Sequence, residues 1–463
     1  MLGGTRAIHC VGVGGSGVSA IAEVLLRLGY LVSGSDAHPS AVTERLARVG
    51  LAFHAGHDAA HVAGADVVVV SSAVRPTNVE IVEARRRGIP VILRGEMLAE
   101  IMRPRFGIAV AGAHGKTTTS SMIAVMLAHA GLDPTAIIGA RVPAFDSNAR
   151  VGRGDYLVAE ADESDRSFLK LMACMTVVTN IDYEHLERYA GFDDLTDAFV
   201  AFASKPPFYG ASVLCIDDDH VRTIVPRVTA RVVTCAVDRA EADLSLRDAQ
   251  VDAGGSRATL VRRRSGDEEV LGTIRVAVPG RHNLQNALAT VAVGLELGLP
   301  FDAIAAGLAA FGGVDRRFER KGEAAGVVVV DDYGHHPSEI VAVLRAARTG
   351  HGGRVVVAFQ PHRYTRTRQL RDEFGSALAL ADLVVLTGIY GAGEDPVPGV
   401  TLEWLAASVE AAAPGRVHVV PDVAQIPVAI AQIARAGDLV ITLGAGSIGD
   451  CGDLILAELC RCP

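Results

Sequence analysis

The chain has 463 residues and a net charge of −9, from 44 basic and 53 acidic residues. Its length allows about three domains of ordinary size, and its acidic balance argues against general nucleic-acid binding, which needs a basic surface. Its apolar runs are shorter than the roughly 20 residues that span a bilayer. No signal peptide is visible, and the seven cysteines form no C-x-x-C pair. We therefore expect a cytoplasmic protein without membrane insertion.

Short apolar runs alternate with helical stretches along most of the chain, which is typical of an α/β fold with mostly parallel sheets. Strands are expected at residues 7–11, 29–33, 66–71, 89–93, 107–111, 156–160, 175–181, 211–216, 327–331, 354–358, 382–387 and 438–443. Residues 230–278 are rich in strand-forming residues and suggest a small antiparallel addition. Seams near residues 102–105 and 312–315 predict three domains, 1–103, 104–313 and 314–463.

The first expected strand runs into Gly12-Val13-Gly14-Gly15-Ser16-Gly17, and the second is followed by Asp36. Taken alone, this pattern is a nicotinamide-binding fingerprint, since the glycines allow close approach to a diphosphate and the acid could hold a ribose hydroxyl. A second G-x-G-x-x-G follows the last strand at residues 444–449. At most one of the two is expected to bind a dinucleotide, so the pattern indicates a tight turn and a diphosphate of unspecified origin.

The expected strand 107–111 leads into Gly112-Ala113-His114-Gly115-Lys116-Thr117-Thr118. Small residues let backbone N–H groups point at one anion, Lys116 can reach the β- and γ-phosphates, and Thr117 offers a hydroxyl to Mg²⁺. An ordinary strand-to-helix turn is the weaker interpretation. The loop is two residues shorter than G-x-x-x-x-G-K-[ST], which points away from ordinary GTPases and motor ATPases. His114 could contact phosphate or be structural.

The expected strands 156–160 and 175–181 bring further polar residues toward this loop. Glu160 ends the first, and a carboxylate at the carboxyl end of a parallel strand is well placed to bind Mg²⁺. A solvated acidic loop would account for Asp162 and Asp165 but less well for Glu160. His185 follows the second strand, although a lone histidine is more often structural than a ligand.

Together these segments resemble the Mur ligase family, the ATP-dependent amide-forming enzymes of peptidoglycan precursor synthesis, over essentially the whole chain. Ala113 stands where the family usually has Thr, Glu184 where Asp is usual, and Ser447, to which we assign no role, where Asp is usual. The motifs lie at residues 12–17, 32–36, 70–74, 94–99, 112–118, 160–165, 180–185, 280–287, 316–319, 331–340 and 359–367. The resemblance implies a Rossmann-like N-terminal domain, a central P-loop-type ATPase domain and a Rossmann-like C-terminal domain.

The resemblance also implies a reaction in which ATP phosphorylates the carboxylate of UDP-N-acetylmuramate. The amine of L-alanine then opens the acyl phosphate to an amide, with release of ADP and phosphate. Lys116, Glu160 and His185 would be catalytic, and Mg²⁺ would be held by Thr117, Glu160 and His185. The expected ATP-binding residues are Gly112, Ala113, His114, Gly115, Lys116, Thr117, Thr118, Asn283, Asn286, Arg317 and Asp332. The expected UDP-sugar residues are Gly12, Gly14, Gly15, Ser16, Gly17, Asp36, Ser71 and Ser72. The expected substrate or amino-acid residues are His335, His362, Arg363 and Arg366.

Other functions remain open on the sequence. A nicotinamide oxidoreductase built on residues 12–17 and Asp36 would leave the loop at 112–118, Glu160 and His185 unexplained. A nucleotide-gated binding module without ligation would need the phosphate loop alone. Within the family, the ligase that attaches a recycled peptide to the same sugar shares the central and C-terminal motifs. Neither the choice of L-alanine over glycine or L-serine nor the choice between monomer and homodimer is fixed.

Overall fold

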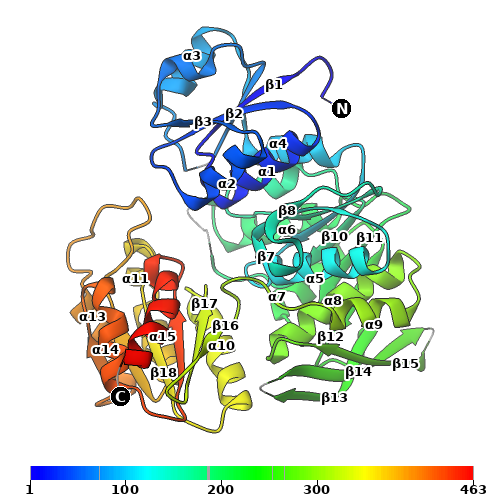
Figure 1. Ribbon diagram of the computed structural model, residues 1–463. Coiled ribbons are helices and arrows are strands. Elements are labelled where there is room, and N and C mark those ends of the chain that lie inside the picture. The colour runs from blue at the N-terminus through cyan, green and yellow to red at the C-terminus, as the bar shows by residue number, and fades with distance from the viewer. Residues whose placement is uncertain (1, 72, 185–187, 253, 265, 462–463) are drawn as a thin grey trace. The chain divides into compact units, whose positions relative to one another are not determined.

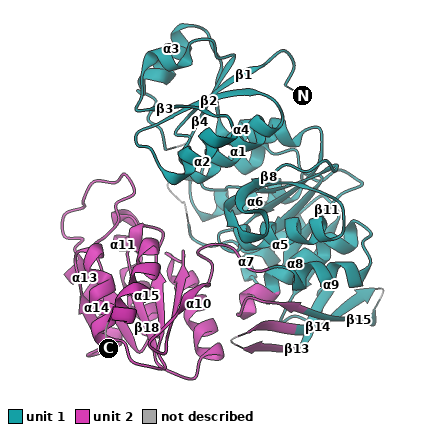
Figure 2. Ribbon diagram, in the orientation of Figure 1, with its two compact units in different colours: residues 1–248, 258–274, 285–311 teal, residues 249–257, 275–284, 312–463 magenta. Residues whose placement is uncertain are grey.

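The computed structural model describes residues 2–71, 73–184, 188–252, 254–264 and 266–461 (Figure 1). Its strands form sheets of five, ten and six strands. The chain divides into two compact units (Figure 2). Unit 1 contains residues 1–248, 258–274 and 285–311, and unit 2 contains residues 249–257, 275–284 and 312–463.

The first sheet lies in unit 1 and is parallel, in the order β3-β2-β1-β4-β5. Its strands are β1 (Ala7–Val11), β2 (Leu31–Asp36), β3 (Ala52–Ala55), β4 (Val67–Val70) and β5 (Val91–Leu93). Its helices are α1 (Ser16–Arg27), α2 (Ala41–Val49), α3 (Val79–Arg86) and α4 (Arg94–Met102). The four valines of β4 are all buried, as expected for a strand covered on both faces.

The second sheet has the order β15-β14-β13-β12-β11-β10-β6-β9-β7-β8. Its parallel centre is β10 (Met175–Val178), β6 (Phe106–Ala111) and β9 (Tyr156–Glu160), so the carboxyl ends of these three strands lie together. The outer strands are β7 (Thr135–Val142), β8 (Ser147–Arg150), β11 (Ala211–Cys215), β12 (Val232–Ala236), β13 (Leu244–Asp252), β14 (Gly255–Arg264) and β15 (Asp267–Val276). The helices of this region are α5 (Lys116–His129), α6 (Phe192–Ala203), α7 (Asp219–Ile224), α8 (Arg281–Glu296) and α9 (Phe301–Ala309).

The third sheet lies in unit 2 in the order β16-β17-β21-β18-β19-β20, with β16 antiparallel to β17 and the other pairs parallel. Its strands are β16 (Glu319–Ala324), β17 (Val327–Asp332), β18 (Val355–Phe359), β19 (Leu383–Leu386), β20 (Val417–Val419) and β21 (Leu439–Leu443). Its helices are α10 (Pro337–Gly350), α11 (Tyr364–Gln369), α12 (Arg371–Leu378), α13 (Leu402–Ala412), α14 (Ile426–Ile433) and α15 (Cys451–Arg461). Two buried clusters of apolar side chains pack against this sheet.

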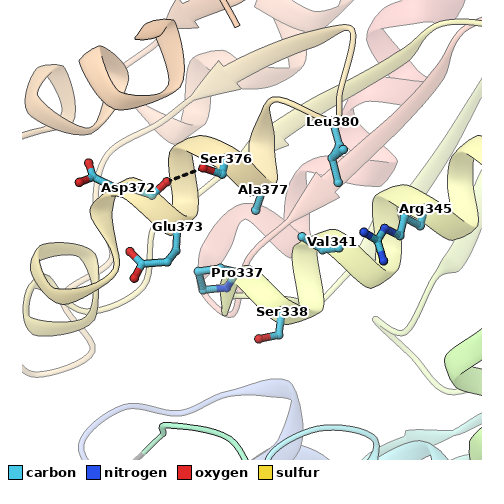
Figure 3. A pocket seen from close by; sticks show the side chains of 9 residues that line it. All are labelled: Pro337, Ser338, Val341, Arg345, Asp372, Glu373, Ser376, Ala377 and Leu380. Carbon is cyan, nitrogen blue, oxygen red and sulfur yellow. Dashed lines mark hydrogen bonds between the residues drawn. The ribbon is translucent and has the colours of Figure 1, made fainter. Parts of the chain in front are cut away.

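A hollow of about 570 Å³ lies between α10 and α12 in unit 2 (Figure 3). Its lining combines apolar side chains such as Val341 and Leu380 with Arg345, Asp372 and Glu373. None of the substrate residues expected from the sequence lines this hollow.

The first two sheets share one hydrophobic core within unit 1. A single cluster of buried side chains runs from Ile8 and Leu25 through Met102 to Leu157 and Phe199. A polar network crosses the same boundary, because Arg45 bonds to Glu23 and donates to Asn148 Oδ1 over 3.2 Å, while Ser147 donates to Glu23 over 2.8 Å. The N-terminal sheet is thus packed onto the central one by both apolar and polar contacts.

The α/β class with mostly parallel sheets is confirmed, and every strand predicted from an apolar run is present within a few residues. Strands β3, β7, β8, β16 and β20 were not predicted. The β-rich segment 230–278 extends the second sheet, but β12 and β13 are paired in parallel, so the antiparallel prediction was wrong for this pair. The three domain boundaries stay a prediction. Among the helices of the described residues, none is both long and apolar enough to cross a membrane.

Candidate active site

The loop at residues 112–118 connects β6 to α5 and packs on the end of β10. Gly112 sits so close to Thr179 and Asn180 that a Cβ there would collide with both residues. Gly115 adopts a φ of +83°, and a Cβ there would lie 2.7 Å from Asn286 Oδ1. Since only glycine fits these two positions without strain, the sequence folds the loop into a tight turn at the start of α5. A helix N-terminus at such a turn presents its first N–H groups to an anion.

Asn180 holds this turn from the neighbouring strand end. The Asn180 side chain accepts a hydrogen bond from His114 N over 2.8 Å and donates to His114 O over 2.9 Å. His114 Nε2 lies 3.0 Å from Asp182 Oδ2. Asn286 accepts a hydrogen bond from Thr119 Oγ1 over 3.1 Å and thereby contacts the same loop from α8.

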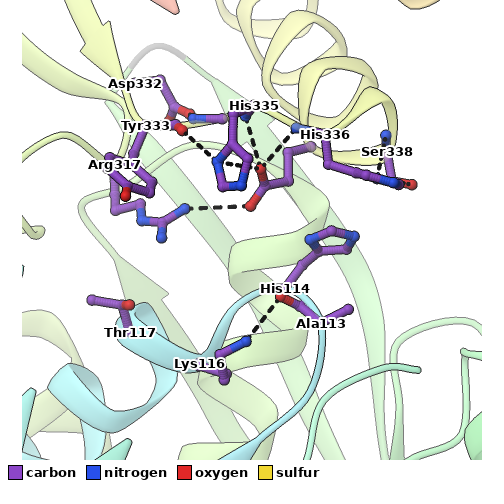
Figure 4. Close-up of polar contacts among 12 residues, drawn as sticks. Ala113, His114, Lys116, Thr117, Arg317, Asp332, Tyr333, His335, His336 and Ser338 are labelled. Atoms are coloured by element: carbon purple, nitrogen blue, oxygen red, sulfur yellow. Dashed lines mark hydrogen bonds and ion pairs between the residues drawn. The ribbon is translucent and has the colours of Figure 1, made fainter. Parts of the chain in front are cut away.

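Lys116 folds back against its own loop (Figure 4). Its ammonium donates to Gly112 O over 2.5 Å, to Ala113 O over 3.1 Å and to Glu163 Oε1 over 2.8 Å. The carboxylates of the following segment, Glu163 foremost, raise the pKa of Lys116 although burial opposes this shift. The lysine is therefore fully charged at neutral pH.

Thr117 and Glu160, two of the three predicted metal ligands, are in contact. Thr117 Oγ1 donates to Glu160 Oε2 over 2.9 Å, and Gly139 N donates to the same oxygen over 2.9 Å. A hydroxyl and a carboxylate at adjoining strand and helix ends are oxygen donors of the kind that Mg²⁺ prefers, so these residues fit that cation. The third predicted ligand, His185, lies outside the described residues.

The acidic segment after Glu160 is not a solvated loop, so that interpretation of Asp162 and Asp165 was wrong. Arg94, the first residue of α4, forms an ion pair with Asp162 and lies 3.9 Å from Asp165. The pKa of the Asp162 carboxyl falls to about 2, because Arg94 and Lys116 together outweigh the effect of burial. A cation from helix α4 thus neutralises an acid beside the phosphate loop.

The glycine loop at residues 12–17 joins β1 to α1. The N–H groups of Gly12 and Val13 donate to Ser35 O over 2.9 and 3.0 Å, and Gly14 N donates to Asp36 Oδ2 over 2.8 Å. Helix α1 begins at Ser16 without a side-chain cap or an acid in its first turn, which leaves its N–H groups available to an anion. Arg94 lies against Gly17, where a Cβ would be 2.8 Å from Nη1.

Two further residues expected near the UDP-sugar come from the end of β4. Ser71 adjoins the first glycine loop, since a Cβ at Gly12 would lie 3.5 Å from Ser71 Cβ. Its hydroxyl accepts a hydrogen bond from Ala73 N over 3.3 Å. Ser72 lies outside the described residues. The structure therefore groups the described members of the expected UDP-sugar set around one strand-to-helix turn.

In unit 2, Arg317 and Asp332 lie together at the end of β17 (Figure 4). The Asp332 carboxylate accepts hydrogen bonds from Phe318 N and Gly334 N, each over 2.7 Å, and burial raises its pKa to about 6. Arg317 stacks over the Tyr333 ring and lies 3.6 Å from Glu339. Asn283, expected with the ATP group, belongs to this unit and donates to Pro279 O over 2.8 Å.

Adjacent His335 and His336 have different partners, as expected for histidines that do not share one ligand. His335 Nδ1 lies 3.1 Å from Tyr333 O, and His336 Nδ1 lies 3.1 Å from Ser338 Oγ. Glu339 Oε2 accepts hydrogen bonds from the N–H groups of both histidines, over 2.9 and 3.2 Å. This carboxylate fixes the loop to the first turn of α10.

His362 links three of the expected substrate residues. Its ring lies 5.4 Å from that of His335 and stacks on Tyr390, and its Nδ1 lies 3.2 Å from Arg366 Nη1. Burial and the neighbouring His335 lower the pKa of His362 to about 3, so the imidazole is neutral at pH 7. Arg363 starts the same turn, with its N–H donating to Tyr390 O over 2.8 Å. These residues form one polar group that comes from the segments after β17, β18 and β19.

The glycine loop at residues 444–449 is filled by side chains of unit 2. Arg316 donates to Gly444 O over 2.6 Å, and Gln360 Oε1 accepts a hydrogen bond from Ile448 N over 3.0 Å. Ser447 Oγ lies 3.2 Å from Gln360 Nε2. These hydrogen bonds hold the second G-x-G-x-x-G loop against Arg316 and Gln360 of the same unit.

Sequence reasoning missed several residues that hold these loops, namely Arg94, Glu163, Asn180 and Asp182. All four belong to recognised motifs, at residues 94–99, 160–165 and 180–185, so their position beside charged loops was a usable signal. The contact between Glu163 and Lys116 joins residues 47 apart in sequence. No local pattern indicates that contact.

Comparison with known proteins agrees with this geometry. The chain matches the family profiles described as "Mur ligase family, catalytic domain" at residues 7–106, "Mur ligase middle domain" at residues 110–294 and "Mur ligase, glutamate ligase domain" at residues 316–446. A UDP-N-acetylmuramate–L-alanine ligase of Geotalea daltonii is 50% identical over 463 residues, covering 100% of both chains. One from Anaeromyxobacter sp. is 52% identical over 452 residues, covering 98% of this chain and 97% of the relative.

Solved structures give the same result. The UDP-N-acetylmuramate–alanine ligase of Thermotoga maritima superposes with a TM-score of 0.84 at 27% identity, covering 98% of this chain and 99% of that chain. A murein peptide ligase of Psychrobacter arcticus shares the fold, with a TM-score of 0.72 at 24% identity and 99% coverage of both chains. The profiles and relatives extend over nearly all of the sequence that carries the loops described above. The chain belongs to the Mur ligase family.

Proposed function

We propose that this chain catalyses the ATP-dependent joining of L-alanine to the carboxylate of UDP-N-acetylmuramate, in the cytoplasm and as a step of peptidoglycan precursor synthesis. The observation that carries the proposal is the contact of Thr117 with Glu160 beside Lys116 at the carboxyl ends of β6 and β9. This arrangement supplies a phosphate loop, a cation and metal-binding oxygens at one edge of the sheet. The named relatives and the first glycine loop support the choice of sugar nucleotide and amino acid.

Amines do not attack the muramoyl carboxylate directly. The reaction therefore first needs a leaving group on the carboxylate oxygen. Transfer of the γ-phosphoryl group of ATP to the muramoyl carboxylate forms a carbon–oxygen–phosphorus link and releases ADP. The amine of L-alanine then attacks the acyl carbon, phosphate leaves, and the amine loses a proton. Both reactants of the first step are anions, so Lys116 and the first N–H groups of α5 would neutralise charge at the phosphates.

Thr117, Glu160 and His185 would hold Mg²⁺, which supplies further charge neutralisation at the phosphate oxygens when bound. The loop at residues 12–17, together with Asp36, Ser71 and Ser72, would bind the UDP-sugar through the N-terminus of α1. Asn283, Asn286, Arg317 and Asp332 would contact ATP. His335, His362, Arg363 and Arg366 would bind substrate, with the neutral His362 acting as a hydrogen-bond acceptor.

The direct test measures ADP release with each substrate omitted in turn. We expect ADP only when UDP-N-acetylmuramate and an amino acid are both present, and we expect L-alanine to exceed glycine and L-serine in kcat/KM. ADP released without the sugar nucleotide would contradict ligation. Preference for a tripeptide over L-alanine would instead favour the peptide-attaching member of the family.

We expect Glu160→Gln to raise the Mg²⁺ concentration needed for half-maximal rate and to lower kcat by about tenfold or more, because an amide binds this cation more weakly than a carboxylate. His185→Ala should act in the same direction. Mg²⁺ titrations of the initial rate check both changes. Glu100→Gln, which removes an exposed acid paired with Arg103 on α4, is the matched control. Mg²⁺ dependence like that of wild type in both site variants would exclude these two ligands.

A further inference from the structure

All three N–H donors of the Lys116 ammonium already bind acceptors of the protein in this structure. A lysine ammonium carries three N–H donors, and all three are directed at Gly112 O, Ala113 O and Glu163 Oε1. A phosphate oxygen can therefore bind the ammonium only after at least one of these contacts has been broken. Of the three acceptors, only the Glu163 carboxylate carries a full negative charge, so the ion pair with Glu163 opposes the movement of Lys116 toward a phosphate most strongly.

Glu163 is anchored at its backbone and buried at its side chain, so we take its carboxylate to stay in place when the lysine moves. The Tyr189 hydroxyl donates to Glu163 O over 2.6 Å, and Arg166 N donates to the same oxygen over 3.0 Å. The Glu163 side chain is 3% exposed, and its Oε2 is buried without a hydrogen-bond partner. Within the described part of the chain, Lys116 provides its one ion pair. Departure of the lysine would leave a carboxylate buried without its cation, which is costly unless the group is neutralised.

We propose that Glu163 is a positioning residue that holds Lys116 in a resting position on the loop. When ATP binds, Lys116 leaves Glu163 and pairs with the terminal phosphates. Glu163 then binds a proton from solvent. The inference rests on the proposed use of ATP. In the resting state, burial raises the pKa of Glu163 to about 7 although Lys116 opposes the shift, and Asp162 raises it further. The loss of Lys116 removes the opposing cation, so the pKa must rise again and protonation follows near neutral pH.

The sign of the pH dependence follows from this order of events. Above pH 7 the free protein carries an ionised Glu163, whereas the nucleotide complex carries a protonated one. Binding must then take up a proton, so the affinity for Mg·ATP falls as the pH rises, by up to tenfold per pH unit. Lys116, Asp162 and Tyr189 are the titratable groups that interact with this carboxyl, and Lys116 is the one whose position changes.

The test is calorimetric titration with Mg·ATP between pH 7.5 and 9, without sugar nucleotide or amino acid, in buffers of different ionisation enthalpy. For wild type we expect an uptake approaching one proton per nucleotide at pH 8. Glu163→Gln keeps an acceptor for Lys116 but removes the charge that holds it. We expect this variant to bind Mg·ATP at least threefold more tightly at pH 8, with proton uptake near zero.

Asp165→Asn is the matched control, because it removes a negative charge from the same segment at a residue whose nearest cation is Arg94, 3.9 Å away. We expect its proton uptake and its affinity to stay within twofold of wild type. Equal tightening in both variants, or unchanged uptake and affinity in Glu163→Gln with an unchanged melting temperature, would overturn the inference. A wild-type chain that binds no Mg·ATP would overturn the proposed function as well, which distinguishes the two failures.

Discussion

Lys116→Ala should lower the rate of ligation at least about a hundredfold, because it removes the cation expected at the β- and γ-phosphates in the transition state. Binding of UDP-N-acetylmuramate should remain near wild type, since that ligand is expected at residues 12–17 on the first sheet. Steady-state ADP release and calorimetry with the sugar nucleotide measure the two effects. Turnover above a few per cent of wild type would contradict the role of Lys116.

Stability needs a separate control here, since Lys116→Ala leaves Glu163 without its ion-pair partner. The double variant Lys116→Ala/Glu163→Gln removes both charges and should recover melting temperature without recovering turnover. Lys170→Ala removes a lysine whose ammonium pairs with Glu96 at the surface over 2.5 Å. Because exposed ion pairs contribute little, this variant should behave like wild type in both assays.

Gly14→Val should raise KM for UDP-N-acetylmuramate by about tenfold or more, because the loop has no room for a side chain. A Cβ at Gly14 would lie 2.8 Å from Asp36 Oδ2, the oxygen that accepts the hydrogen bond from Gly14 N. The valine would therefore displace Asp36 and distort the turn that faces the diphosphate. Affinity for Mg·ATP, which depends on residues 112–118, should stay near wild type.

The control for this variant is Gly4→Val, since a Cβ at Gly4 meets no atom within 4 Å. The KM of Gly4→Val for UDP-N-acetylmuramate should match wild type.

The loop at residues 12–17 also allows a test between the two enzyme classes that the sequence leaves open. Fluorescence titration with NADH should detect no binding to wild type. Tight NADH binding that is lost in Gly14→Val, without binding of the sugar nucleotide, would favour an oxidoreductase.

The sequence predicted the parts of this protein that depend on local pattern. The strand at β6 and the loop after it were predictable because an apolar run, two glycines and a lysine occur in one short stretch. Strand β7 was missed because residues 135–142 mix apolar side chains with glycine and arginine, so no clear alternation marks a strand. Strand β16 was missed for a similar reason, since Glu319–Ala324 is mostly charged and pairs at the edge of its sheet.

Contacts between distant segments could not be predicted in the same way. Both G-x-G-x-x-G loops satisfy the same pattern, and only the structure shows that Gln360 and Arg316 fill the second one. Asp162 looked like a solvent-exposed acid until the fold brought Arg94 to it from 68 positions away. Such pairs depend on which strand ends meet. The order of strands in a sheet cannot be predicted from a short segment of sequence.

The core shared by the first two sheets bears on how this chain can be divided. If residues 1–103 were removed, the apolar side chains of β7 and β8 that pack against α1 in the common cluster would be exposed to water. Loss of the same piece would also leave Asp162 without Arg94. A central fragment made alone should therefore aggregate, whereas a fragment that keeps residues 1–311 together retains this core. For this chain, we expect an exchange of segments between relatives to succeed only when the regions of the first and second sheets are exchanged together.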